Sequence, residues 1–316
     1  MRLNQCVAVS GFRAGPPMAC YFPIDAFRSH AGGVTFSRKG AYLDLPIQIP
    51  CNQCIGCRLE KSRQWALRCT HEAKLYKNNS FITLTYNSDH LPLTNNSLPT
   101  LNLRHFQLFL KRLRKKYSNK TIRFYHCGEY GDMNHRPHYH ALLFNHDFED
   151  KKLWKIHKDQ NYYTSEVLDG LWTDPKTKSN MGFSTIGDLT FDSAAYVARY
   201  CLKKITGKNA EDYYQGRVPE YATMSRRPGI GNGWLDKFKS DVYPSGFIIH
   251  EGQKMQPPKY YDRVTNETDE KAVRRSKILR MQEAKKHAAD NTPARLSDRH
   301  TVHQARAKLL KRDHDK

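Results

Sequence analysis

The residues best suited to chemistry lie in the run Arg136–His140, which reads Arg-Pro-His-Tyr-His. If this run is a strand, His138 and His140 face one side and Tyr139 faces the other. Two imidazoles about 7 Å apart, from the ~3.3 Å rise per residue, can hold one divalent ion. An isolated His-x-His pair is more often two packed or hydrogen-bonded histidines, so the pair alone does not establish a metal site.

Glu129 supplies a third candidate ligand. It lies nine residues before His138, on the preceding strand of a predicted hairpin that would bring its carboxylate beside the two imidazoles. One carboxylate with two imidazoles suits Mg²⁺ or Mn²⁺ and leaves positions open for a substrate oxygen. Alone, Glu129 would be interpreted as a solvated charge at a strand end.

A second group of reactive side chains follows in the run Tyr196–Lys204. On a helix at about 100° per residue, Tyr196, Tyr200 and Lys203 cluster on one side. The nearly opposite side carries an apolar stripe that would face the core, so we expect the two phenols and the ammonium to point outward and meet the metal site. The stripe consists of Phe191, Ala194, Ala195, Ala198, Leu202 and Ile205.

These groups together indicate phosphoryl transfer. A phenol is a poor nucleophile at its ordinary pKa near 10. It can attack phosphorus when a metal neutralises the phosphate and a cation lies nearby. Two phenols one helical turn apart could act alternately, one in cutting and one in transfer.

Strands joined by both hairpins and helices must position these residues. Together they predict an α+β domain with a mainly antiparallel central sheet and flanking helices. Strands are expected at Ser80–Tyr86, Thr121–Tyr130, Arg136–Phe144 and Gly182–Leu189, and helices at Cys57–Tyr76, Leu103–Tyr117, Lys151–His157 and Phe191–Ile205.

At this point the chain resembles the HUH single-strand endonucleases, most closely the two-tyrosine replication initiators of the gokushovirus group of Microviridae. Phe81–Tyr86 resembles their first motif, Gly128–Gly131 with Arg136–His140 the second, and Tyr196–Lys204 the third. The resemblance implies His138 and His140 as metal ligands and Tyr196 and Tyr200 as nucleophiles. It also suggests Glu129 as a third ligand and Lys203 as an electrostatic aid.

The resemblance further implies a function and its partners. It points to a replication initiator that nicks and rejoins single-stranded DNA through a phosphotyrosine intermediate, starting and ending rolling-circle replication of a small phage genome. Its partners would be single-stranded DNA at a replication origin and the helicase and polymerase of the host, in the host bacterial cytoplasm. No Gly-x4-Gly-Lys-Ser/Thr phosphate loop is present, which indicates that another protein unwinds the duplex.

Cys51, Cys54 and Cys57 have the spacing Cys-x2-Cys-x2-Cys, which is typical of soft-metal ligands. Structural Zn²⁺ fits better than an iron–sulfur cluster, because Lys61 occupies the next ferredoxin position. Cys20 is the preferred fourth ligand, and Cys69 and His71 remain alternatives. Three packed or free thiols are the competing interpretation.

Composition favours a polyanionic partner. The chain has 52 Lys and Arg against 31 Asp and Glu, a formal net charge of +21. No apolar run is long enough to span a membrane, and the first twenty residues lack a signal-peptide pattern. A second reading is therefore a non-enzymatic, zinc-stabilised nucleic-acid-binding protein. A third is a metal-dependent hydrolase in which water attacks.

The chain is expected to divide into four regions. Residues 1–57 form an irregular region with the cysteine cluster, 58–206 the HUH nuclease core, 207–262 an extension of the core, and 263–316 a basic tail that is helical or disordered. Met18 is an alternative start to Met1.

Overall fold

The structure is a computed structural model that describes residues 20–131, 134–157, 160–200, 204–205, 207 and 210–309. It divides into two compact units. One spans Ser62–Lys239, and the other combines the described residues before Ser62 with those after Lys239. Helices α1 (Ile55–Ala73) and α6 (Asn232–Val242) each run across one of the two boundaries.

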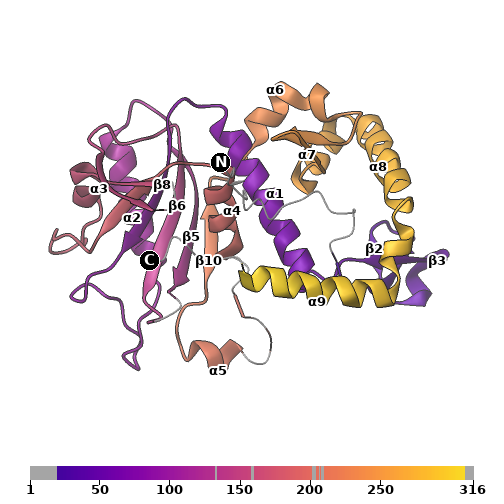
Figure 1. The fold of residues 1–316 in the computed structure, drawn as a ribbon, viewed down its shortest axis with the longest axis horizontal. Helices are drawn as coiled ribbons and strands as arrows, with labels where there is room; N and C mark the ends of the chain where they lie inside the picture. The colour runs from indigo at the N-terminus through magenta and orange to yellow at the C-terminus, as the bar shows by residue number, and fades with distance from the viewer. Residues whose placement is uncertain are drawn as a thin grey trace, which may run out of the picture. The chain divides into compact units, whose positions relative to one another are not determined.

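The unit Ser62–Lys239 is built on an antiparallel sheet that has seven strands among the described residues. Their order is β10-β5-β6-β4-β9-β8-β7, so the hairpin β5–β6 lies near the centre and β7 at an edge (Figure 1). This confirms the predicted α+β class. The strands are β4 (Asn79–Thr85), β5 (Arg123–Tyr130), β6 (Pro137–Phe144), β7 (Lys152–His157), β8 (Gln160–Thr164), β9 (Ser184–Gly187) and β10 (Tyr221–Met224).

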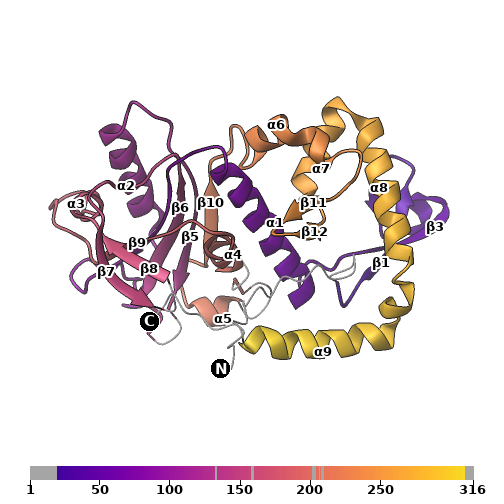
Figure 2. The same cartoon turned by 45° about the horizontal axis from the view of Figure 1, so that its top comes forward.

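Helices cover the sheet on both faces. Helices α2 (Leu103–Lys116) and α3 (Glu166–Leu171) lie on one face, where Tyr139 is buried in the main apolar core. Helix α4 (Phe191–Tyr200) lies on the other face, over β5, β6 and β10 (Figure 2). The part of α1 after Ser62 shares this second face, since Trp65 packs on Tyr125 with ring centroids 4.9 Å apart. The short helix α5 (Ala210–Tyr214) precedes β10.

The sequence of α2 accounts for its position. Asn102 caps the helix, because its side chain accepts a hydrogen bond from the backbone N–H of Arg104. Buried side chains then recur at helical spacing, which turns one side of the helix toward the sheet. These are Phe106, Phe109, Leu110 and Leu113.

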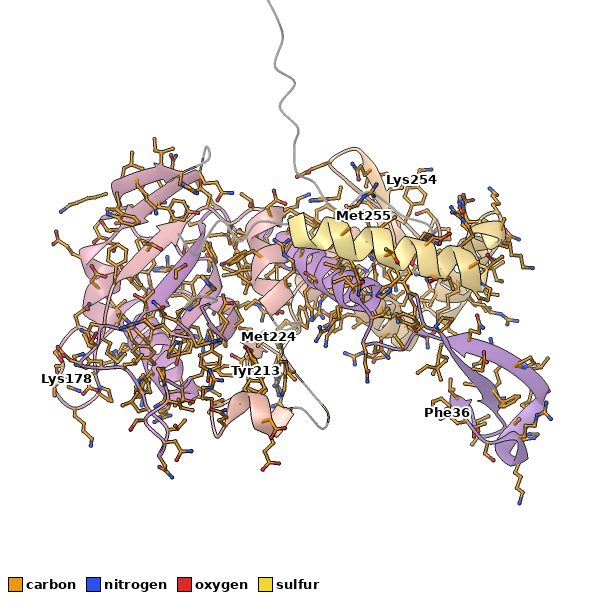
Figure 3. The ribbon with its side chains drawn as sticks, turned by 60° about the horizontal axis from the view of Figure 1, so that its bottom comes forward. Phe36, Lys178, Tyr213, Met224, Lys254 and Met255 are labelled. Carbon is orange, nitrogen blue, oxygen red and sulfur yellow. The ribbon has the colours of Figure 1, made fainter. Side chains whose placement is uncertain are left out.

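The second unit contains smaller elements. It has a three-stranded sheet in the order β2-β1-β3, the hairpin β11–β12, and helices that carry most of the basic C-terminal sequence. Phe36, at the edge of the small sheet, is exposed to solvent (Figure 3). The elements are β1 (Ile24–Ser29), β2 (Val34–Thr35), η1 (Arg38–Gly40), β3 (Ala41–Ile49), β11 (Ile248–His250), β12 (Gln253–Met255), α7 (Lys259–Thr268), α8 (Glu270–Lys285), η2 (Ala288–Asn291) and α9 (Pro293–Leu309).

Two predicted elements differ from the structure. Lys151–His157 was expected to be a helix, but Lys152–His157 is the strand β7, paired with β8. A short apolar run has no decisive period, and the β-forming Tyr162–Thr164 segment provides a partner strand. The helix expected over Phe191–Ile205 is α4, whose assigned range ends at Tyr200, and Lys204 and Ile205 are not helical.

Candidate active site

Three candidate metal ligands meet on the α4 face of the sheet. The register of β5 and β6 places Glu129 directly opposite His138. Oε1 of Glu129 lies 3.2 Å from Nε2 of His138 and 2.9 Å from Nε2 of His140. All three side chains are buried, and Tyr139 between the histidines points to the other face, as strand alternation predicts.

The outer nitrogen of each imidazole has a neighbour that fixes the ring. Nδ1 of His138 lies 3.2 Å from the backbone oxygen of Arg136, to which it donates. Nδ1 of His140 lies 2.9 Å from the hydroxyl of Thr83, which is opposite His140 in the register of β4 with β6. Both contacts present the Nε2 atoms toward Glu129, the arrangement that orients histidine ligands in metal sites.

The site strongly favours a charged carboxylate. Burial by itself raises the pKa of Glu129, but the neighbouring imidazoles of His138 and His140 outweigh it and lower that pKa to about 2. A carboxylate oxygen approaching two imidazole nitrogens this closely needs positive charge among them. A divalent ion or imidazolium protons would supply it.

The spacing of the ligand atoms fits a small divalent ion. Bonds of 2.0–2.1 Å at right angles place neighbouring ligand atoms roughly 3 Å apart. The two distances from Glu129 Oε1, 2.9 and 3.2 Å, match this spacing, and the ligand atoms of the triad all lie within 4.8 Å of one another. Two imidazoles and one carboxylate would leave further coordination positions to substrate or water.

Tyr196 reaches this triad from α4. Its ring centroid lies 5.1 Å from that of His140 and 6.3 Å from that of Phe81, both in edge-on geometry. Tyr196 is only 4% exposed, so the expectation that it points outward from the helix is wrong. The physical reason is that α4 is buried on more than one side, since Ser193–Ala198 are all buried.

The other two residues of the third motif are only partly accessible to description. The backbone of Tyr200 belongs to α4, one turn after Tyr196, and its side chain lies outside the described part. Lys203 falls outside the described residues altogether.

The four cysteines of the predicted cluster converge in the other unit. The sulfurs of Cys20, Cys51, Cys54 and Cys57 lie within 4.8 Å of one another, and the Cys51 and Cys57 sulfurs are 4.0 Å apart. A tetrahedral ion with bonds of about 2.3 Å would place its sulfurs roughly 3.8 Å apart. All four are free thiols, so the geometry suits a four-thiolate metal site.

Backbone N–H groups point at three of these sulfurs. The N–H of Cys51 donates to Cys20 at 3.2 Å, that of Cys54 to Cys51 at 3.3 Å, and that of Tyr21 to Cys54 at 3.4 Å. Burial opposes ionisation of Cys51, but backbone donors outweigh it and lower the pKa of Cys51 to about 7. Burial, reinforced by the neighbouring sulfurs, raises the pKa of Cys57. A cation bound among them would favour the thiolate form of all four.

Sequence reasoning missed Thr83 and the backbone of Arg136 as partners of the histidines. Phe81–Tyr86 was expected to be a strand, but local sequence does not reveal that β4 lies beside β6. The only signal was the position of Thr83 within the first motif.

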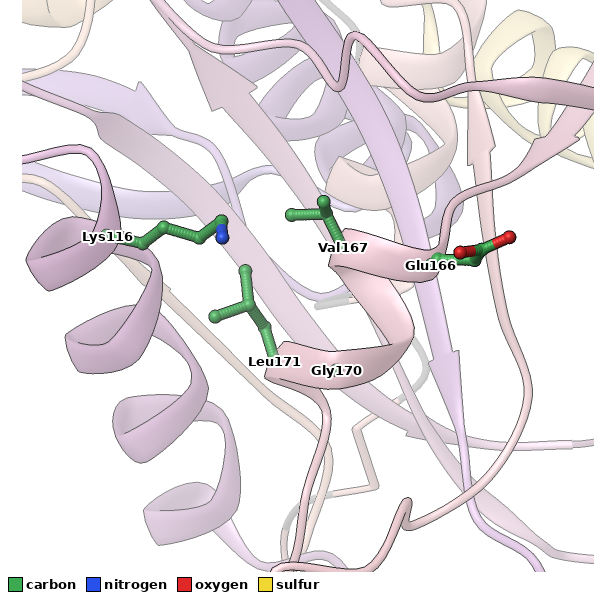
Figure 4. A pocket seen from close by; sticks show the side chains of 5 residues that line it. All are labelled: Lys116, Glu166, Val167, Gly170 and Leu171. Atoms are coloured by element: carbon green, nitrogen blue, oxygen red, sulfur yellow. The ribbon is translucent and has the colours of Figure 1, made fainter.

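Two further observations bear on the site. A shallow pocket lined by Lys116, Glu166, Val167, Gly170 and Leu171 lies between α2 and α3, away from the triad (Figure 4). Among the described residues, no helix has both the length and the apolar character required to cross a bilayer.

Comparison with known proteins places the triad in a matched region. Residues 79–205 match the family of replication-associated proteins described by its member ORF2, and they include Glu129, His138, His140 and Tyr196. The cysteine cluster lies before this region. No solved structure matches the chain.

Several phage proteins resemble most of the chain. It is 34% identical over 254 residues to Replication-associated protein VP4 of Bdellovibrio phage phiMH2K, covering 77% of this chain and 76% of the relative. It is 35% identical over 225 residues to Replication-associated protein ORF2 of Spiroplasma virus 4, covering 68% and 67%. It is 30% identical over 219 residues to Replication-associated protein ORF4 of Chlamydia phage 1, covering 67% and 52%.

Proposed function

Because the chain belongs to the ORF2 family of replication-associated proteins, we propose that it is a replication initiator that nicks and rejoins single-stranded DNA. The reaction would pass through a phosphotyrosine intermediate and would start and end rolling-circle replication of a small phage genome. The observation that carries this proposal is the 5.1 Å approach of the Tyr196 ring to the ring of His140, beside the Glu129 carboxylate.

Glu129, His138 and His140 would hold Mg²⁺ or Mn²⁺. A bound ion supplies positive charge beside the scissile phosphate and so makes phosphorus accessible to a weak nucleophile. The protein contributes the rigid β5–β6 hairpin and the contacts from Thr83 and Arg136, which fix both imidazoles before substrate arrives.

The covalent step exchanges one phosphate ester for another. A bond forms between Oη of Tyr196 and phosphorus, and the bond from phosphorus to the 3′-oxygen breaks. The phenol proton passes to water, and the leaving 3′-oxygen takes a proton from water. The products are a free 3′-hydroxyl, which can prime synthesis, and a 5′-phosphotyrosine link that preserves an activated phosphate for rejoining.

Tyr200 would serve as the second nucleophile. It lies one turn after Tyr196 on α4, and residues at this spacing share one side of a helix. After one round of synthesis, Tyr200 would cut the new junction, and the released 3′-hydroxyl would displace Tyr196 and close the circle. Lys203 is proposed as a nearby cation that stabilises the phosphate charge.

The cysteine cluster would hold one structural Zn²⁺. The 4.0 Å sulfur separation and the N–H donors to sulfur support this assignment. Leu296 of α9 packs on Cys20 and Cys54, and the hydroxyl of Tyr21 hydrogen-bonds Nδ1 of His303. An ion there would therefore stabilise the attachment of the C-terminal helix within this unit.

The proposed partners follow from this activity. Single-stranded DNA at a replication origin would be the substrate, and the host helicase and polymerase would unwind and copy the duplex in the host bacterial cytoplasm. The formal charge of +21 favours the DNA partner.

A covalent-trapping experiment separates this proposal from its alternatives. Full-length protein would be incubated with Mn²⁺ and single-stranded, 3′-labelled fragments of the genome that encodes it, and then run on a denaturing gel with sodium dodecyl sulfate. We expect label to migrate with the protein, and the double variant Tyr196→Phe, Tyr200→Phe to bind DNA without forming the adduct. Cleavage without an adduct would indicate a hydrolase, and binding alone would indicate a zinc-stabilised binding protein.

A further inference from the structure

Two aromatic side chains are exposed together in the unit Ser62–Lys239. Trp154 of β7 is 49% exposed and Phe183, just before β9, is 45% exposed. Their ring centroids are 4.9 Å apart and their planes are inclined by 63°. The ammonium of Lys155 lies 4.6 Å from the centre of the Trp154 ring. Exposed rings in mutual contact with a cation form a surface that is unusual for a solvated sheet edge.

This aromatic pair lies on the same face of the sheet as the metal triad. Thr83 contacts His140, and Thr185 of β9 is directly opposite Thr83. Phe183 precedes Thr185 by two residues and therefore shares its face. Consistent with this register, the backbone N–H of Thr85 donates to the carbonyl of Phe183 at 3.0 Å.

Two irregularities in the backbone direct these side chains. The register of β7 with β8 shifts between Leu153 and Lys155, so Trp154 is the extra residue of a β-bulge, a feature that re-aims side chains. Gly182 has φ +151°, and a Cβ there would lie 2.4 Å from the carbonyl oxygen of Thr85. Only glycine permits this close approach, which sets Phe183 beside Thr85.

The helix that covers the triad does not extend over the aromatic pair. Helix α4 packs on β5, β6 and β10, whereas Phe183 lies two strands beyond β6 on the opposite side. At ~4.8 Å per strand, this places its backbone about 10 Å from the strand of the histidines. The nucleotides next to a phosphate held at the triad can reach that distance.

We propose that Trp154 and Phe183 form a stacking site for unpaired bases of the single-stranded DNA that flanks the scissile phosphate, with Lys155 beside the DNA backbone. Every base presents an aromatic face, so such a site holds single strands without reading sequence, and a nearby cation strengthens it. The proposal rests on the proposed function only for the identity of the substrate.

Charge and strand geometry favour DNA over a second copy of this chain as the occupant. Strand β7 is an edge strand, but its bulge and its lysines, Lys152 and Lys155, are features that oppose edge-to-edge pairing. The same lysines and the formal charge of +21 attract a polyanion.

Equilibrium binding tests this site without any cleavage. Fluorescence anisotropy would follow a labelled oligothymidylate titrated with full-length protein in chelator, so that failure of the nicking chemistry cannot affect the result. Trp154→Ala and Phe183→Ala should each weaken binding on the order of tenfold. The matched control is Leu153→Ala, because Leu153 is 56% exposed on the same strand and is paired with Tyr163, which packs into the core of the opposite face.

Three comparisons identify stacking as the cause. The loss should vanish with an oligonucleotide that keeps its phosphates but lacks bases, and with duplex DNA. The slope of affinity against salt should not change for Trp154→Ala, whereas Lys155→Gln should reduce it by about one.

Unchanged oligothymidylate binding by both aromatic variants, with wild-type thermal stability, would overturn the proposal. So would a loss that is equal for base-free DNA, or a loss equal to that of Leu153→Ala. Wild-type sedimentation as a dimer that Trp154→Ala converts to monomer, with DNA binding unaffected, would instead assign the surface to a second copy.

Discussion

Replacing Thr83 with valine tests whether the β4 contact prepares the metal site. Valine keeps the branched shape of threonine and removes only the hydroxyl, which lies 2.9 Å from Nδ1 of His140. The stacking of His140 on Phe81, with ring centroids 5.5 Å apart, should survive. The imidazole would then lose the partner that fixes its rotation, while its position in the strand remains the same.

The size of the effect follows from the burial of His140. Leaving a buried hydrogen-bonding group without its partner costs about 1–3 kcal/mol, and His140 is fully buried. Loss of an outer partner of a metal ligand typically weakens metal affinity about 10–100-fold, which corresponds to roughly 1.4–2.7 kcal/mol. The two estimates agree, so Thr83→Val should raise the dissociation constant for Mn²⁺ by about 10–100-fold.

Isothermal titration with Mn²⁺ would measure this constant, and DNA cleavage against Mn²⁺ concentration would provide a second readout. We expect the half-saturating Mn²⁺ concentration to rise while the rate at saturation stays near wild type. Thr83→Ser should restore affinity, because serine retains the hydroxyl. Thr185→Val is the matched control, since Thr185 is directly opposite Thr83 and half-buried on the same face. Unchanged Mn²⁺ affinity in Thr83→Val, or equal losses in Thr83→Val and Thr185→Val, would refute the reasoning.

Three further predictions concern other parts of the chain. Tyr196→Phe and Tyr200→Phe should each still form the covalent DNA adduct but produce few closed circles, whereas the double variant should form no adduct; loss of adduct in one single variant and wild-type behaviour of the other in both assays would show that one tyrosine suffices. Cys54→Ser should reduce the zinc content from about one ion per chain and lower Tm, whereas Cys69→Ala should leave the zinc content unchanged, and metal analysis that finds no zinc in the reduced wild-type protein would exclude the four-thiolate site. Burial lowers the pKa of His146 from 6.5 to about 4, so the unfolded chain binds more protons between these values and the free energy of unfolding should fall as pH drops from 6.5 to 4. Thermal melts across this range should show a weaker pH dependence in His146→Gln, and an identical dependence in both proteins would contradict the assignment.

The sheet and the triad were accessible from sequence because their signals are local. Alternation in Arg136–His140 predicts that the two histidines share a face, and the short connection to Glu129 predicts the hairpin that pairs it with His138. The four cysteines were likewise identified by spacing, including Cys20 as the fourth member. Family membership confirms the resemblance drawn from the three motifs.

The remaining features depend on contacts between distant segments. A helical projection shows that Tyr196 and the apolar stripe lie on different sides of α4, but it does not show that both sides are covered. The strand β7 needs β8 to select it over a helix, and Thr83 becomes a partner of His140 only because β4 lies beside β6. Local propensity contains no information about these pairings.

The hairpin β5–β6 also sets an order of assembly. Glu129 and His138 are separated by nine residues, so closing one short loop brings two ligands together at small entropic cost and on the microsecond timescale of hairpin formation. Tyr196 arrives from a helix much later in the chain, after β7, β8 and β9 have joined the sheet. During synthesis the nascent chain can therefore capture an ion before its nucleophile has emerged from the ribosome, and the enzyme becomes reactive toward DNA only once the rest of the unit is in place.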